Sequence, residues 1–164
     1  MKTLIVTPKG MNKLREEVES LRGQMANLQG QTAEIMEVGG NQWHDNASFD
    51  QQGVDLRRLN AKLKETQETI SRATIASPPD APIFKVEIGT CVRFYRGEEQ
   101  EPHELVIVGY GESDPDNGLY AYDTPFASQF IGKRPADEFL DDTRHTKEII
   151  YILSVQFAPE VFTT

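Results

Sequence analysis

The amino-acid sequence predicts an α+β protein, in which a long antiparallel helical hairpin precedes a small antiparallel β-sheet domain with one short helix. Three observations support this prediction. Two long segments repeat hydrophobic residues at alternating spacings of three and four, two adjacent glycines separate these segments, and β-branched and aromatic residues dominate the chain after a proline-rich stretch. The pattern therefore changes near residue 78, and we expect a domain on each side.

The first helix is expected to begin at residue 8. Thr7 is a good N-cap residue, and Pro8 suits the first helical position, where its missing N–H costs nothing. From there the contact positions of a coiled coil recur along the chain, and we call them the seam. They are Met11, Leu14, Val18, Leu21, Met25, Leu28, Thr32 and Ile35. A helix of about 30 residues spans about 45 Å.

The second helix repeats this pattern until Ser77 and Pro78 end it. Its seam residues are Phe49, Gln52, Leu56, Leu59, Leu63, Thr66, Ile70 and Ala73. A short connection makes the two helices antiparallel neighbours. Residues 1–77 are therefore predicted to form a coiled-coil domain with its tip at about residues 39–48. A coiled coil that only dimerises remains an alternative.

The tip carries side chains that chain reversal does not require. Gly39 and Gly40 adopt positive φ easily and can reverse the backbone. Trp43, the single tryptophan, follows them beside His44 and Asp45, where a structural loop favours small polar residues. His44 is either a proton carrier or an exposed polar residue, and Trp43 either stacks on a base or aromatic group or packs against the hairpin end. We interpret the tip as a presented functional element.

The net charge of −9 is distributed unevenly along the 164 residues. Residues 1–77 hold ten basic and ten acidic side chains, whereas residues 78–164 hold seven and sixteen. A general nucleic-acid surface would need a basic face, so a protein partner with a basic patch fits better. Cys91, the single cysteine, excludes an intramolecular disulfide and a Cys-rich zinc site. No signal peptide or membrane span is evident, and we expect a cytoplasmic protein.

Residues 78–83 form a proline-rich linker, and residues 84–164 form the second domain. Its predicted antiparallel strands are Phe84–Arg96, His103–Tyr110, Gly118–Asp123 and Lys147–Phe157. Thr124 and Pro125 repeat the N-cap signal, and Gly132 follows as a stop, so one short helix is expected. The sequence shows no phosphate-binding loop, nucleophile triad or metal-ligand cluster. We expect His103 and His145 at the surface.

Several segments resemble the bacterial Gre transcript-cleavage factors, GreA and GreB. Residues 7–18, Thr-Pro-Lys-Gly-Met-Asn-Lys-Leu-Arg-Glu-Glu-Val, resemble the entry into the family's first helix. Residues 45–49 resemble its acidic-Asn-Ala-x-aromatic tip motif. In the second domain, residues 107–109, 123–126 and 131–133 resemble its Val-Gly, Ser-Pro-hydrophobic and Ile-Gly-Lys elements. The ordered set covers nearly the whole chain.

The resemblance implies that the coiled coil enters the secondary channel of RNA polymerase while an FKBP-like C-terminal domain docks on the channel rim. Two tip carboxylates in the family help to hold a second Mg²⁺ and a water at the polymerase active centre, so that the polymerase cuts backtracked RNA. The protein is then an accessory factor rather than an enzyme, with Mg²⁺ only in the complex. Contact with the RNA 3′ end stays open, and neither membrane binding nor independent sequence-specific DNA binding is expected.

The tip departs from the family pattern at both carboxylate positions. Asp45 stands where the family has Glu, and Gln42 stands where it has Asp. One ligand is therefore shortened by a methylene and the other is neutral, and misplacement on the order of 1 Å can cost about 10²-fold in rate. If Asp45 and Asp50 are both helical, Asp50 does not replace the missing charge, since five residues turn a helix by about 140°; only an irregular turn would pair them.

We therefore assign two groups of candidate residues. Asp45 and Gln42 are the candidates for catalytic support, with His44 as a more speculative third, and Asp45 is the candidate ligand of the shared Mg²⁺. The candidate partner contacts are Trp43, Asn46, Phe49, Asp123, Thr124, Pro125 and Phe126. The alternatives are a Gre-like channel regulator or inhibitor that does not support cleavage, and a coiled-coil adaptor for another protein. Prolyl isomerase activity is a weaker idea, because a fold does not confer a function.

Overall fold

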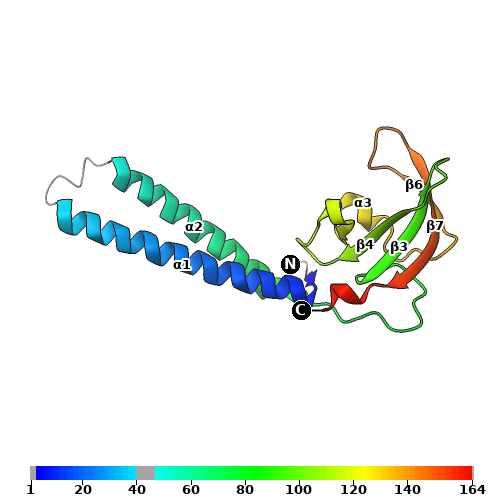
Figure 1. Cartoon of the computed structure of the whole chain (residues 1–164), viewed down its shortest axis with the longest axis horizontal. Helices are drawn as coiled ribbons and strands as arrows, with labels where there is room; N and C mark the ends of the chain where they lie inside the picture. The colour runs from blue at the N-terminus through cyan, green and yellow to red at the C-terminus, as the bar shows by residue number, and fades with distance from the viewer. Residues whose placement is uncertain (1–2, 40–46, 164) are drawn as a thin grey trace. The chain divides into compact units, whose positions relative to one another are not determined.

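The computed structural model describes residues 3–39 and 47–163. The chain divides into two compact units (Figure 1). Residues 12–72 form the helical unit, and residues up to 11 form the second unit together with residues from 73 onwards. The sequence analysis had grouped residues 1–77 together. The difference arises because both ends of that stretch pair with each other as strands and belong to the C-terminal unit.

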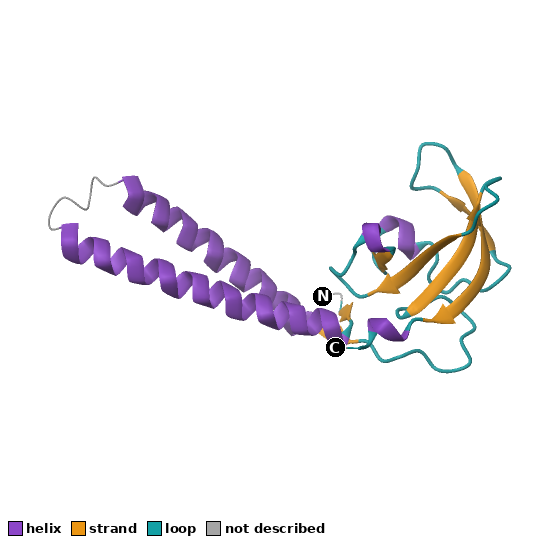
Figure 2. Cartoon of the chain, viewed as in Figure 1, coloured by secondary structure: helices purple, strands orange, loops and turns teal. Residues whose placement is uncertain are grey.

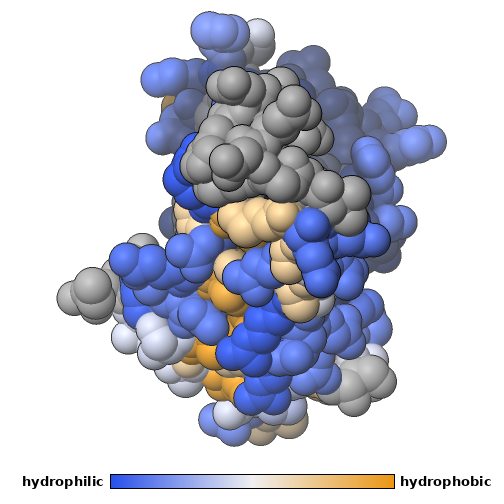
Figure 3. All heavy atoms as spheres, turned by 90° about the vertical axis from the view of Figure 1, so that its left-hand side faces the viewer, coloured by the Kyte–Doolittle hydropathy of each residue, from blue (hydrophilic) through white to orange (hydrophobic). Residues whose placement is uncertain are grey.

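The helical unit consists of α1 (Pro8–Gly39) and α2 (Ala47–Arg72), which run antiparallel (Figures 1 and 2). The predicted α+β class and the hairpin are confirmed, and α1 begins at the predicted Pro8. Within this unit, Val18, Leu21 and Thr66 are buried in the seam. Most side chains on the outer faces are charged or polar, and Figure 3 shows a largely hydrophilic face of the molecule, with most of its hydrophobic residues gathered near the centre.

A small parallel sheet joins the two ends of the hairpin segment. Strand β1 (Leu4–Val6) pairs with β2 (Ala73–Ile75), so that Ile5 lies beside Thr74. The sequence analysis missed β2 because Ala73 continues the seam spacing, which led to a predicted helix end at Ser77. The helix instead stops at Arg72, where two β-branched residues, Thr74 and Ile75, favour an extended chain.

The main sheet of the C-terminal unit is mixed, which corrects the prediction of a purely antiparallel one. Its strand order is β5-β4-β3-β7-β6, and the pair β4–β5 is parallel. The strands are β3 (Thr90–Arg96), β4 (His103–Val108), β5 (Leu119–Ala121), β6 (Glu138–Asp141) and β7 (Glu148–Phe157). The loop between β4 and β5, with a 3₁₀ turn at Pro115–Asn117, returns the chain to the same end of the sheet. Strand β6 was not predicted, and residues 84–89 are not a strand.

The core lies between one face of this sheet and the short helix α3 (Pro125–Ser128) (Figure 2). The cap signal was correct, since the Thr124 side chain accepts a hydrogen bond from the N–H of Ala127 at 3.4 Å. Gly132 has a φ of 80°, but α3 already ends at Ser128, so this glycine is not the helix stop that was predicted. The buried core residues are Val86, Val92, Phe94, Leu105, Ile107, Ala127, Phe130, Ile150, Ile152 and Val155.

The first turn of α1 is held by a carboxylate from the loop after β4. Glu112 Oε1 accepts a hydrogen bond from the backbone N–H of Thr7 at 2.8 Å, and Oε2 accepts one from the Thr7 hydroxyl. Thr7 Oγ1 in turn accepts a hydrogen bond from the N–H of Gly10 at 3.0 Å. A Cβ at Gly10 or Gly109 would lie 2.1 or 2.3 Å from Glu112 Oε1, so both positions require glycine for this carboxylate to fit.

Glu112→Gln is expected to lower the free energy of unfolding by about 1–3 kcal/mol. The NH₂ group of glutamine would face either the N–H or the hydroxyl of Thr7, and each of these donors needs an acceptor. Urea denaturation followed by circular dichroism measures the loss. Glu101→Gln, an exposed position, is the matched control and should change little. Equal stabilities for the two variants would contradict the role of Glu112.

Candidate partner-docking site

The predicted tip residues cannot be placed from the structure. Gln42, Trp43, His44, Asp45 and Asn46 lie outside the described residues. Phe49 falls within α2, but its side chain is also outside the description. Their assigned roles remain predictions, and the candidate site that the structure does describe is on the C-terminal unit.

The predicted docking edge, Asp123 to Phe126, forms the start of α3. Asp123 and Pro125 are exposed and Thr124 is half-buried as the N-cap residue. Phe126 is half-buried, because its ring packs edge-on against other aromatic rings. The centroid distances are 6.2 Å to Phe94, 5.6 Å to Tyr120 and 5.1 Å to Phe130. The edge thus combines exposed polar and proline surface with a ring anchored in the core.

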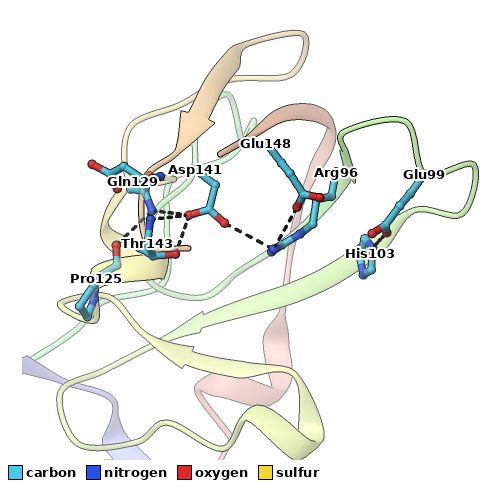
Figure 4. Close-up of polar contacts among 9 residues, drawn as sticks. Arg96, Glu99, His103, Pro125, Gln129, Asp141, Thr143 and Glu148 are labelled. Atoms are coloured by element: carbon cyan, nitrogen blue, oxygen red, sulfur yellow. Dashed lines mark hydrogen bonds and ion pairs between the residues drawn. The ribbon is translucent and has the colours of Figure 1, made fainter. Parts of the chain in front are cut away.

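A small cavity of about 160 Å³ lies beside this ring. Aromatic side chains of Phe94, Tyr120 and Phe126 contribute to its lining, as does His103. His103 is exposed as expected, but it is not simply solvated, since its ring stacks on Phe94 at 5.5 Å and contacts Glu99 (Figure 4). The hydrogen bond from His103 is the main cause that lowers the pKa of Glu99. The cavity is therefore apolar on one side and charged on another.

A buried ion pair lies next to the cavity (Figure 4). Arg96 on β3 has 7% of its side chain exposed, and Asp141 on β6 has 0%. Arg96 Nη1 lies 3.4 Å from Asp141 Oδ2 and 3.8 Å from Glu148 Oε2. The guanidinium carbon is 5.2 Å from the centroid of the Phe126 ring, within the range of a cation–π contact. Asp141 and Glu148 thus neutralise the charge of Arg96 inside the unit. The guanidinium group of Arg96 also packs against Phe126 of the predicted docking edge.

Asp141 connects this pair to α3. Its Oδ1 accepts hydrogen bonds from the Thr143 N–H at 3.0 Å, from the Thr143 hydroxyl and from Gln129 Nε2 at 3.3 Å. The same Gln129 Nε2 donates to the carbonyl of Pro125 at 3.3 Å. Burial alone would raise the pKa of Asp141, but these hydrogen bonds and the charge of Arg96 outweigh it, so the pKa lies below its ordinary value.

This network was not predicted from the sequence, although the alternation of residues along β3 indicates part of it. Inward and outward residues alternate along β3, and Val92, Phe94 and Arg96 share the inward face. A buried position for Arg96 follows from that alternation and implies a carboxylate partner. The identity of that partner does not follow, because Asp141 is on a strand far away in the chain.

Asp141→Asn is expected to lower the free energy of unfolding at pH 7 by about 3 kcal/mol, because it leaves Arg96 less well neutralised. The folded pKa of Asp141 lies below the unfolded value, so its contribution is present above about pH 4 and is lost as pH falls through the folded pKa. Urea denaturation at several pH values should show the two proteins converging in acid. Asp142→Asn, at the exposed neighbouring position, is the control. A constant difference at every pH would contradict this role.

The described residues contain neither a metal-binding cluster nor a membrane-spanning helix. Within residues 3–39 and 47–163 there is no group of three or more His, Cys, Asp or Glu side chains arranged to hold a metal ion. In the same ranges, every helix is too short or too polar to cross a membrane.

Comparison with known proteins extends over both units. The family described as "Transcription elongation factor, GreA/GreB, C-term" matches residues 81–157. Transcription elongation factor GreA of a Nitratiruptor species is 31% identical over 157 residues, which cover 96% of this chain and 95% of that protein. Transcription elongation factor GreA of Thermoanaerobacter pseudethanolicus is 30% identical over 142 residues, covering 83% and 86%.

Among solved structures, GreA factor homolog 1 (Gfh1) of Thermus thermophilus is 18% identical, with a TM-score of 0.43 and coverage of 94% of this chain and 99% of that one. The sequence similarity decides the family, since the identity to GreA of Nitratiruptor extends through the helical unit and the C-terminal unit. The chain belongs to the GreA/GreB family of transcription elongation factors.

Proposed function

We propose that this protein is an accessory factor of RNA polymerase, in which the hairpin enters the secondary channel and the C-terminal unit docks on the channel rim. The observation that carries the proposal is the similarity to GreA over 96% of the chain, because it includes the hairpin as well as the C-terminal unit. Helices of 32 and 26 residues give the hairpin a reach of about 40–48 Å at 1.5 Å per residue. A hairpin of that length can enter a channel while the C-terminal unit stays at the rim.

At the polymerase, the tip modulates or stimulates cleavage of backtracked RNA. Asp45 offers an anionic oxygen and Gln42 a neutral carbonyl oxygen, and oxygen is the ligand that Mg²⁺ prefers. The metal belongs to the polymerase, and the protein needs no cofactor and performs no catalysis alone. With one carboxylate instead of two, we expect weak stimulation.

Contact with the RNA 3′ end, if the tip makes one, rests on stacking rather than on charge. Between Arg22 and Arg57 the chain has five acidic residues and no Lys or Arg. Lys and Arg supply most of the affinity for phosphates, and acidic side chains repel them, so this part of the hairpin is poorly suited to hold the RNA backbone. Trp43 supplies a ring on which a base can stack.

A second candidate function is a channel regulator that does not support cleavage. The observation that favours it is the neutral Gln42, which cannot compensate the charge of a dication. A third candidate, an adaptor for another protein, would be favoured by a pull-down that recovers no polymerase subunits. Cleavage of backtracked complexes by purified polymerase, with and without this protein, separates the first two.

The docking edge is tested with the double variant Asp123→Ala and Phe126→Ala. A half-buried aromatic anchor beside exposed polar residues is typical of a binding hot spot, so affinity for purified polymerase should fall at least about tenfold, or about 1.4 kcal/mol. Phe84→Ala is the matched control, since Phe84 is 66% exposed and lies elsewhere on the unit. Circular dichroism checks that each variant is folded. Affinity within twofold of wild type would refute the docking role.

The tip is tested with Asp45→Asn, which keeps the size of the side chain but removes its charge. Cleavage should fall to the level of polymerase alone, while affinity is unchanged, because the charge acts at the metal. Restoring the family residues with Gln42→Asp and Asp45→Glu should raise cleavage above wild type. Asp50→Asn is the control for an equal loss of charge nearby. Strong cleavage by the wild type that Asp45→Asn does not reduce would exclude the metal role. Absence of cleavage both in the wild type and in the variant with the family residues would favour the non-cleaving regulator.

A further inference from the structure

The seam of the hairpin contains a polar contact between the helices. Thr32 Oγ1 on α1 lies 2.8 Å from Gln52 Oε1 on α2, and both residues are half-buried. The same hydroxyl donates to the carbonyl of Leu28 at 2.9 Å, one turn earlier in α1. Both residues occupy seam positions that are otherwise mostly apolar, so the contact replaces a hydrophobic one near the end of α1 and the start of α2.

The contact does not depend on which way round the Gln52 amide is placed. The Thr32 hydroxyl carries one proton, which the carbonyl of Leu28 and the amide oxygen of Gln52 both attract. Rotation of the Gln52 amide by 180° would present its NH₂ group to the hydroxyl and leave that proton for Leu28, so the contact persists in either orientation. A different pairing of the helices would set the Gln52 amide against leucine side chains, which costs free energy, whereas the Thr32 hydroxyl would keep its bond to the Leu28 carbonyl. Polar pairs at such positions fix register in coiled coils.

The location of the pair determines what it controls. Val18 and Leu21, towards the base of the hairpin, are buried, whereas Leu28 and Leu56, near the pair, are only half-buried. Among the described seam residues, hydrophobic burial therefore restrains the helices less beside the pair than beside Val18 and Leu21. A hydrogen bond is directional, whereas hydrophobic contact is not, so the pair supplies the rotational restraint that burial lacks there.

We propose that Thr32 and Gln52 are positioning residues that fix which faces of α1 and α2 meet at the distal end of the hairpin. Each residue turns a helix by 100°, so a loss of this restraint redirects the chain that leaves α1 at Gly39 and enters α2 at Ala47. The effect at the polymerase rests on the proposed function, whereas the restraint itself is a property of the free protein.

The restraint is tested in the free, full-length protein by electron–electron distance measurement. Spin labels at Glu34→Cys and Asp50→Cys, both exposed, report the distal separation in a Cys91→Ser background. The double variant Thr32→Val and Gln52→Leu should broaden the distance distribution, and Thr32→Ser should leave it narrow, because serine keeps the hydroxyl. The matched control is Thr66→Val, since buried Thr66 donates to the carbonyl of Lys62 within its own helix.

Urea denaturation of the same variants separates loss of specificity from loss of folding. The apolar double variant should be at least as stable as wild type, since it replaces two polar seam residues with hydrophobic ones. A distribution as narrow as that of wild type in the double variant would overturn the proposal.

The consequence is tested with purified polymerase at saturating factor concentration. The double variant should reduce the effect on RNA cleavage about tenfold, while the half-saturating concentration stays within twofold and Thr32→Ser retains the wild-type effect. If the double variant shows a broadened distance distribution but an unchanged effect on RNA cleavage at saturating concentration, the positioning role is overturned. Absence of any polymerase binding by the wild type would instead refute the proposed function, and the distances would still decide whether the pair restrains the hairpin.

Discussion

The hydrogen bonds around Glu112 are the constraint on which the start of α1 depends. One carboxylate satisfies the backbone N–H and the hydroxyl of Thr7, and the missing side chains of Gly10 and Gly109 leave it room. Anionic groups stabilise helix N-termini, so the contact also favours the first turn of α1 electrostatically. Helix α1 therefore begins at a point fixed by polar contacts of Glu112 with Thr7.

The helical part of the fold was predictable because its signals are local. Heptad spacing predicted both helices, and the pairs Thr7-Pro8 and Thr124-Pro125 marked two helix starts correctly. Strand pairing was less predictable. Strand β2 continues the seam pattern of α2, and β6 has only four residues. The parallel pairing of β4 with β5 depends on the path of a loop, which residue alternation does not encode.

The candidate site was also predictable only in part. The start of α3 was located from its cap residues and from the resemblance to the Gre family, whereas the support behind it was not. Arg96, Asp141 and Gln129 come from three separate elements, and only the strand register brings them together. The sequence does not show that Phe126 is partly enclosed by neighbouring rings from β3, β5 and the turn after α3.

The absence of Lys and Arg between Arg22 and Arg57 has a consequence before any contact is made. The remaining parts of the helical unit, residues 12–22 and 57–72, hold eight basic and five acidic side chains, so negative charge gathers at one end of the hairpin and positive charge at the other. Such a separation is an electric dipole along the helices, and the field of a charged partner exerts a torque on it. Below about a Debye length of separation, roughly 8 Å at physiological ionic strength, diffusional encounters are therefore biased towards one end of the hairpin leading.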